Sequence, residues 1–139
     1  LWKVYPVGGG VAALQEIDGT GESTVVVMLK RATEWLIAAQ NPDGGWGGNR
    51  DVQPSSPEET GLSVCVLARQ AHRQPDMPGL AAALEKGGNW LMHATEQGRV
   101  FASSPIGFYF ARLWYYEELY PLIFVTGAME ELDRLYRVT

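Results

Sequence analysis

The 139-residue chain has the usual size of one domain, and its composition, 46% hydrophobic and 19% charged, is typical of a folded globular protein. The net charge is −5 and no run of Lys or Arg forms a basic stripe, so we expect no nucleic-acid partner. The single cysteine, Cys65, excludes an internal disulfide, and no apolar run reaches the roughly 18 residues needed to span a bilayer.

Turn-forming residues divide the chain into helical segments, with interruptions at 18–19, 41–45 and 75–78. The β-branched run at 24–27 is the main strand signal, but the helical pattern that continues from it favours a helix. Between 106 and 118 we expect a short helical or irregular segment. The sequence therefore predicts an all-α fold with about five helices, over residues 7–17, 24–40, 57–73, 79–96 and from Pro121 onward.

The clearest local signal is Ser56-Pro57-Glu58-Glu59. Ser56 is expected to cap the backbone N–H of Glu59, and the Glu59 carboxylate is expected to reach back to the N–H of Ser56. Pro57 suits the first helical position because it has no N–H to leave unpaired. This capping box accounts for the two acids without a catalytic role, and the helix that follows is apolar nearly all round, as expected of a buried helix.

A sequence repeat relates two parts of the chain at a spacing of 55 residues. The first copy, residues 31–46, begins RATEWL, and the second copy, residues 86–101, begins KGGNWL. Each has a basic residue, a small residue, two variable positions, then Trp and Leu. Repeated helix pairs at a period of this order predict an α/α array, in which each pair buries its apolar face against its neighbours.

The first copy continues as IAAQNPDGGW, and the whole run resembles the QW motif of terpenoid cyclases and protein prenyltransferases, most closely that of squalene-hopene cyclases. The second copy is degenerate, with Thr95 at the Gln position and Val100 or Phe101 near the expected Trp. We expect the motif to tie helix ends together, through a side-chain amide and a Trp that offers a flat face and an N–H donor. The residues assigned to this structural motif are Arg31, Trp35, Gln40, Gly44, Trp46, Lys86 and Trp90.

The resemblance implies that residues 1–139 form the C-terminal portion of an (α/α)6 barrel, a partial toroid with alternating inner and outer helices. The opening LWKVY also reads as sequence from within a longer protein. Half a toroid would leave the apolar faces of inner helices open to water, so we expect homo-oligomerisation or a marginally stable bundle.

The activity implied by the resemblance is that of a class II triterpene cyclase, an isomerase of squalene or a related polyprenyl chain that needs no cofactor. Such enzymes protonate their substrate with an Asp-x-Asp-Asp acid, which this sequence lacks. We therefore assign no catalytic residue and no metal ligand here, and expect the chain to be inactive alone. Two alternatives stay open: a non-catalytic α/α repeat domain for binding or scaffolding, and a protein prenyltransferase β-like subunit.

The resemblance also implies a substrate cavity lined by aromatic side chains, whose ring faces can stabilise cationic intermediates by cation–π attraction. By resemblance, Tyr5, Tyr109, Phe110 and Tyr116 fall near positions that line the cavity of the family. The expected partner is a polyprenyl or triterpene substrate bound by the full-length protein. The resemblance also implies a cytoplasmic location with peripheral contact to the inner face of the membrane, for which residues 119–125 are the candidate segment.

Overall fold

The computed structural model describes residues 3–17, 23–107 and 114–137 of the chain. The prediction of an all-α fold with about five helices is confirmed, since helices make up most of the described residues and a single small hairpin is the other regular element among them. The elements, in chain order, are α1 (Val4–Ile17), α2 (Ser23–Ala38), α3 (Pro57–Arg73), α4 (Leu80–Ala94), β1 (Pro105–Gly107), β2 (Trp114–Tyr116) and α5 (Leu119–Arg137).

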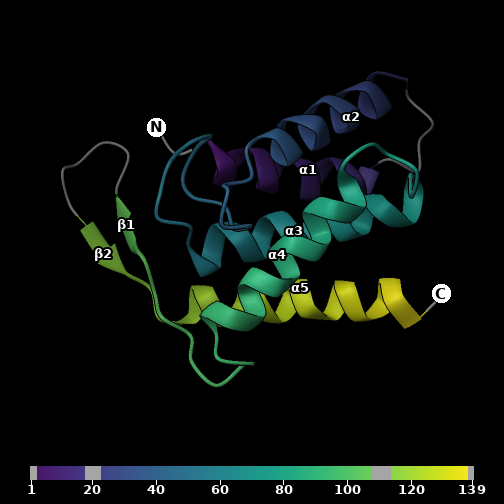
Figure 1. Cartoon of the computed structure of the whole chain (residues 1–139). Helices are drawn as coiled ribbons and strands as arrows, with labels where there is room; N and C mark the ends of the chain where they lie inside the picture. Colours follow the sequence, from purple (N-terminus) through teal and green to yellow (C-terminus); the bar gives the residue numbers. More distant parts are fainter. Residues whose placement is uncertain (1–2, 18–22, 108–113, 138–139) are drawn as a thin grey trace.

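Helix α3 lies at the centre of the bundle and contacts each of the other four helices (Figure 1). Helix α5 packs along it most extensively, and α1 also packs on it while carrying α2 on its other side. The expectation that α3 is a buried helix is confirmed, because Val64, Val66, Leu67 and Ala68 are all 0–1% exposed. Apolar residues nearly all round this helix match its neighbours on several sides.

The start of α3 follows the capping box in part. The Ser56 hydroxyl accepts a hydrogen bond from the Glu59 backbone N–H at 3.2 Å, and Pro57 occupies the first turn, as predicted. The reciprocal bond was predicted wrongly. The Ser56 N–H donates instead to the carbonyl of Trp46 at 2.9 Å, because the loop before α3 folds back against the helix start and supplies a backbone acceptor.

Helix α1 begins earlier than predicted, at Val4 rather than at residue 7. Pro6 is tolerated there because the N–H groups of a first helical turn have no partner within the helix. The backbone N–H groups of Lys3 and Val4 both donate to the carbonyl of Gly48. These bonds hold the start of α1 against the loop between α2 and α3.

The segment between 106 and 118, predicted to be short helical or irregular, differs from that prediction at 106–107 and 114–116, while 108–113 lie outside the described residues. Residues 105–107 and 114–116 pair as an antiparallel hairpin, with Pro105 opposite Tyr116. The pairing suits aromatic residues, which favour strands. Helix α5 then begins at Leu119, and Pro121 lies in its first turn, two residues later than the start of the helix.

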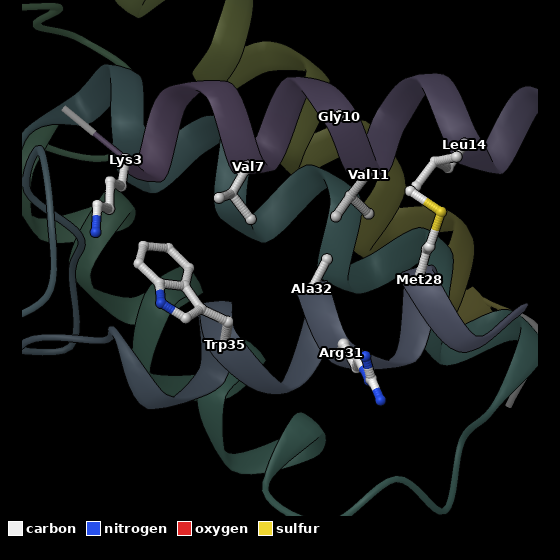
Figure 2. A pocket seen from close by; sticks show the side chains of 9 residues that line it. All are labelled: Lys3, Val7, Gly10, Val11, Leu14, Met28, Arg31, Ala32 and Trp35. Atoms are coloured by element: carbon white, nitrogen blue, oxygen red, sulfur yellow. The ribbon is translucent and has the colours of Figure 1, made fainter. Parts of the chain in front are cut away.

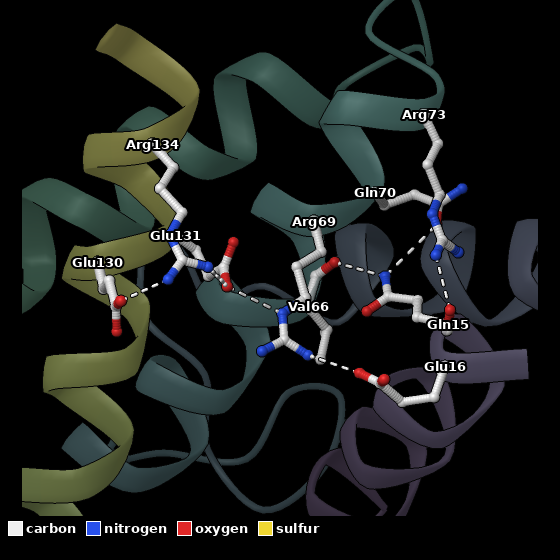
Figure 3. Close-up of polar contacts among 9 residues, drawn as sticks. All are labelled: Gln15, Glu16, Val66, Arg69, Gln70, Arg73, Glu130, Glu131 and Arg134. Atoms are coloured by element: carbon white, nitrogen blue, oxygen red, sulfur yellow. Dashed lines mark hydrogen bonds and ion pairs between the residues drawn. The ribbon is translucent and has the colours of Figure 1, made fainter. Parts of the chain in front are cut away.

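Polar contacts fasten α1 and α5 to α3 (Figure 3). On the α5 side, Nε of Arg69 lies 3.1 Å from a carboxylate oxygen of Glu131, which is 7% exposed. On the α1 side, the Arg69 guanidinium lies 3.6 Å from Glu16, and the buried Gln15 amide donates to the Val66 carbonyl at 2.9 Å. One face of α3 therefore holds both flanking helices by hydrogen bonds and ion pairs as well as by apolar packing.

Within the described ranges, none of the helices combines the length and the apolar character that crossing a membrane requires.

Candidate functional site

Gln40, two residues beyond the end of α2, joins two distant parts of the fold. Its side-chain Nε2 donates to the Gly44 carbonyl at 2.8 Å and to the Ala83 carbonyl of α4 at 2.9 Å. Both amide hydrogens are thus used, one to close the local turn and one to bind a helix 43 residues further along the chain. We call residues 40–46 the clasp.

The clasp approaches α4 so closely that Gly44 has no room for a side chain. Its φ is +95°, a backbone conformation that favours glycine, and a Cβ there would lie 2.9 Å from the carbonyl oxygen of Lys86. The backbone of Lys86 therefore contacts the clasp while its side chain is exposed. This places two residues of the predicted motif, one from each copy, against each other.

Trp46 is the anchor of the clasp and is 0% exposed. Its indole Nε1–H donates to the carbonyl of Leu36, in the last turn of α2, at 2.8 Å. Its backbone N–H donates to the hydroxyl of Thr60 on α3 at 2.9 Å. A single residue therefore links the end of α2 to the start of α3 and fills space between them. The expected contact between the Trp46 ring and the Gln40 amide stays a prediction.

Asp43 connects the clasp to the Trp of the second copy. One carboxylate oxygen accepts from the backbone of Gly45 at 3.0 Å and from the hydroxyl of Ser55 at 2.8 Å. The other accepts from Nε1 of Trp90 on α4 at 3.0 Å. Trp90, a residue of the second copy, thus forms a hydrogen bond with the clasp of the first copy.

The second copy forms only local contacts at the corresponding place. Thr95, at the Gln position, donates its hydroxyl to the Leu91 carbonyl at 2.7 Å and accepts from the N–H of Gly98 at 3.1 Å. Both partners lie within four residues, so Thr95 caps the end of its own helix. Phe101 is half-buried and Val100 is 43% exposed.

The other two motif residues, Arg31 and Trp35, lie on α2 and line a groove between α1 and α2 (Figure 2). The groove has a volume of about 450 Å³, within the range of small-ligand pockets. Its walls are mainly apolar side chains facing each other from the two helices. The lining residues are Lys3, Val7, Gly10, Val11, Leu14, Met28, Arg31, Ala32 and Trp35.

The four predicted cavity aromatics are only partly described by the structure. Tyr109 and Phe110 lie outside the described residues, as does the side chain of Tyr5, whose backbone is in the first turn of α1. Tyr116, on β2, is 64% exposed. A cavity built from these four residues stays a prediction.

Two buried carboxylates at the start of α3 were read from the sequence only as part of a helix cap. Glu58 is 4% exposed; one of its oxygens accepts from the Ser104 N–H at 2.8 Å and the other is buried without a described partner. The pKa of Glu59 is raised to about 7, mainly because the carboxyl group is buried. A hydrogen bond from its own backbone lowers this pKa, and the charge of the neighbouring Glu58 raises it. Glu59 can therefore exchange a proton near neutral pH.

No three His, Cys, Asp or Glu side chains lie close enough to hold a metal ion in the described part of the chain.

Comparison with known proteins gives a partial match. Over 49 residues the chain is 43% identical to a drimenyl diphosphate synthase of Streptomyces showdoensis, a terpene cyclase-type protein. The match covers 35% of this chain and 9% of that protein, so the chain spans a small part of its relative. No family model matches the chain, and no solved structure matches it. The chain is thus similar to a terpenoid cyclase over about a third of its length.

Proposed function

We propose that this chain is the C-terminal portion of the α/α barrel of a squalene-hopene-cyclase-like class II triterpene cyclase, an isomerase of squalene or a related polyprenyl substrate. The observation that carries the proposal is the clasp, in which Gln40 bonds Ala83 and Trp46 bonds Leu36, so that the residues assigned to the QW motif tie helices together. The partial similarity to a terpene cyclase-type protein supports the same assignment.

The clasp suits the wall of such an enzyme for a physical reason. Cationic cyclisation needs a cavity that excludes water, and a wall of helices can do this only if the helix ends do not fray. Trp46 donates to the Leu36 carbonyl in the last turn of α2, and Gln40 joins the loop after α2 to the Ala83 carbonyl of α4. In this proposal the QW residues have a structural role, and Tyr5, Tyr109, Phe110 and Tyr116 face the substrate, where cation–π attraction can stabilise the intermediates.

The catalytic acid is proposed to lie in a part of the protein beyond this chain. The test is to incubate the whole protein with squalene, and separately with a linear prenyl diphosphate, and to identify products by mass spectrometry. A cyclic triterpene from squalene is the expected result. A cyclic diphosphate alone would keep a class II cyclase but replace the triterpene assignment. No cyclic product from either substrate would contradict the proposal, and turnover by residues 1–139 alone would contradict an acid located elsewhere.

We also propose cytoplasmic, peripheral contact with a membrane through the start of α5. Leu119, Leu122 and Ile123 are 59%, 41% and 57% exposed there, an unusual concentration of large apolar side chains at one helix end. Flotation with liposomes should recover the chain, and Ile123→Glu should abolish recovery. Self-association through the same face is the alternative, and sedimentation would show it as a concentration-dependent increase in mass that Ile123→Glu removes.

A further inference from the structure

The groove between α1 and α2 has a chemistry that the proposed cyclase function does not use. We propose that it binds a single-chain amphipathic anion, such as a long-chain carboxylate, as a free molecule rather than as part of a membrane. The apolar chain lies between the helices and the anionic head pairs with Lys3 or Arg31. The proposal does not rest on cyclase activity.

The apolar part of the groove is built from both helices. Val7, Val11 and Leu14 recur on one face of α1 and point toward Ala32 and Trp35 of α2 (Figure 2). Spacings of three or four residues place such side chains in line along a helix. The result is an elongated apolar surface in which a hydrocarbon chain gains free energy by leaving water.

The described residues that line the groove carry charge of one sign. Lys3 and Arg31 are the only charged residues among them, both are exposed, and none of the described lining residues is a carboxylate. Among the residues that the structure describes, no acidic side chain forms an ion pair with either of them. In a chain of net charge −5, two cations placed beside an apolar groove complement an anionic head group.

Gly10 lines the groove without a side chain. A Cβ placed on Gly10 would meet no atom within 4 Å, so a larger side chain has room there and should obstruct the groove. Gly9 offers a matched control, because its Cβ position is equally unobstructed yet Gly9 does not line the groove. Both lie inside α1, where replacing glycine generally favours the helix. Gly10→Leu and Gly9→Leu should therefore both fold.

The experiment is a titration of the whole 139-residue chain with dodecanoate below its micelle concentration, followed by calorimetry and Trp fluorescence. We expect saturable binding of one dodecanoate per chain. Gly10→Leu should weaken binding at least tenfold, whereas Gly9→Leu should change it less than twofold. Equal effects of the two variants would overturn the assignment to this groove.

The head group is tested by varying its charge on the same chain length. Dodecanol should bind more weakly than dodecanoate, and dodecyltrimethylammonium more weakly still. Lys3→Gln and Arg31→Gln should each weaken dodecanoate binding about threefold, as expected for exposed ion pairs, and the double variant about tenfold. Equal affinity for all three head groups would overturn the anionic part of the proposal.

Two further results would assign the groove to a different occupant. Binding to vesicles of anionic lipid without binding of free dodecanoate would identify a membrane surface instead. A dimer in sedimentation that Gly10→Leu dissociates and dodecanoate does not would identify a second copy of the chain. Either result would contradict the proposal.

Discussion

The two copies of the repeat begin with similar helices and end with different kinds of contact. In the first copy, Gln40 reaches Ala83 on another helix and Trp46 is buried between helices. In the second, the Thr95 hydroxyl bonds to Leu91 and Gly98 nearby in the chain, and the residue in the Trp position is exposed or half-buried. The comparison teaches that the helix half of the motif can persist while the contact that joins helices is lost.

The difference follows from side-chain length and donor number. A glutamine amide has two hydrogens on a side chain long enough to bridge two backbone segments, whereas a threonine hydroxyl has one hydrogen and stays close to its own helix. Trp46 adds both a large apolar surface and an indole N–H donor, whereas Val100 and Phe101, at the corresponding place in the second copy, have no side-chain donor. Substitutions in the first copy should therefore lower the free energy of unfolding more than matching substitutions in the second copy.

The largest effect is expected at Trp46. Trp46→Ala should lower the free energy of unfolding by about 3–5 kcal/mol, because it opens a cavity and removes the indole hydrogen bond to the Leu36 carbonyl. Trp90→Ala, at a half-buried site in the second copy, should cost clearly less. Urea unfolding followed by circular dichroism measures both. Equal losses would mean that the first copy has no special role in stability.

The next effect concerns Glu59, at the helix start that the clasp supports. Its pKa is raised from 4.5 to about 7, so between these pH values the folded state holds the proton more tightly than the unfolded state. Stability should therefore be highest near pH 4, fall as the pH rises to about 7, and level off above that. The shift corresponds to roughly 3 kcal/mol.

Glu59→Gln should remove most of this pH dependence and stabilise the protein at pH 8 relative to the natural chain. Glu85→Gln, which removes an exposed carboxylate on α4, is the control and should leave the pH profile unchanged. Unfolding at pH 4, 6 and 8 gives the comparison. A Glu59→Gln profile that still falls between pH 4 and pH 7 would show that another group is responsible.

Neighbouring glycines on α4 should respond in opposite directions. A Cβ on Gly87 would lie 2.6 Å from Val64 and 2.8 Å from the ring of Trp46, so Gly87→Ala should cost about 1–3 kcal/mol. A Cβ on Gly88 would meet only the end of the Leu132 side chain at 3.2 Å, which can move. Gly88→Ala should be neutral or stabilise by up to about 1 kcal/mol through helix propensity. Thermal unfolding of the two variants measures both effects. If Gly87→Ala did not lower stability, the tight packing of α4 on Trp46 would be contradicted.

The smallest expected difference in stability is between variants of Gln40 and of Thr95, the residues at the Gln position of the two copies. Gln40→Ala should cost about 1–2 kcal/mol, because the Gly44 and Ala83 carbonyls lose a donor. Thr95→Ala should cost about 1 kcal/mol or less, since only a local cap is lost. When Gly44→Ala is already present, Gln40→Ala should lower the free energy of unfolding by less than it does alone, because the loop no longer fits against Lys86. Additive costs in the double variant would argue against a single clasp.

The sequence predicted the elements that local chemistry determines. The turn residues 41–45 and the Ser56-Pro57 signal specify the end of α2 and the start of α3 within the chain itself. The bond from Ser56 N–H to Trp46 was not predicted, because a distant carbonyl displaced the local acceptor. The hairpin was missed for the same reason: Pro105–Gly107 has little strand character until it pairs with Trp114–Tyr116.

The groove was not predicted because its walls come from two helices whose separation is a tertiary property. Arg31 and Trp35 were assigned to a structural motif, and nothing in their spacing indicates an open surface opposite α1. Likewise, the acid pair at 58–59 matched a capping signal, whereas the raised pKa of Glu59 comes from burial in the folded bundle. Local signals therefore gave the helices, and the sites depend on how those helices pack.

The central claim is that Trp46 closes the clasp by donating its indole hydrogen to Leu36 inside the bundle. Hydrogen exchange of the tryptophan indole N–H groups by NMR tests it most directly, with Trp46→Phe used to assign the signal. The account predicts that this hydrogen exchanges as slowly as the protein unfolds globally, and far more slowly than the indole hydrogen of half-buried Trp35. Exchange of the two at similar, fast rates would contradict the claim.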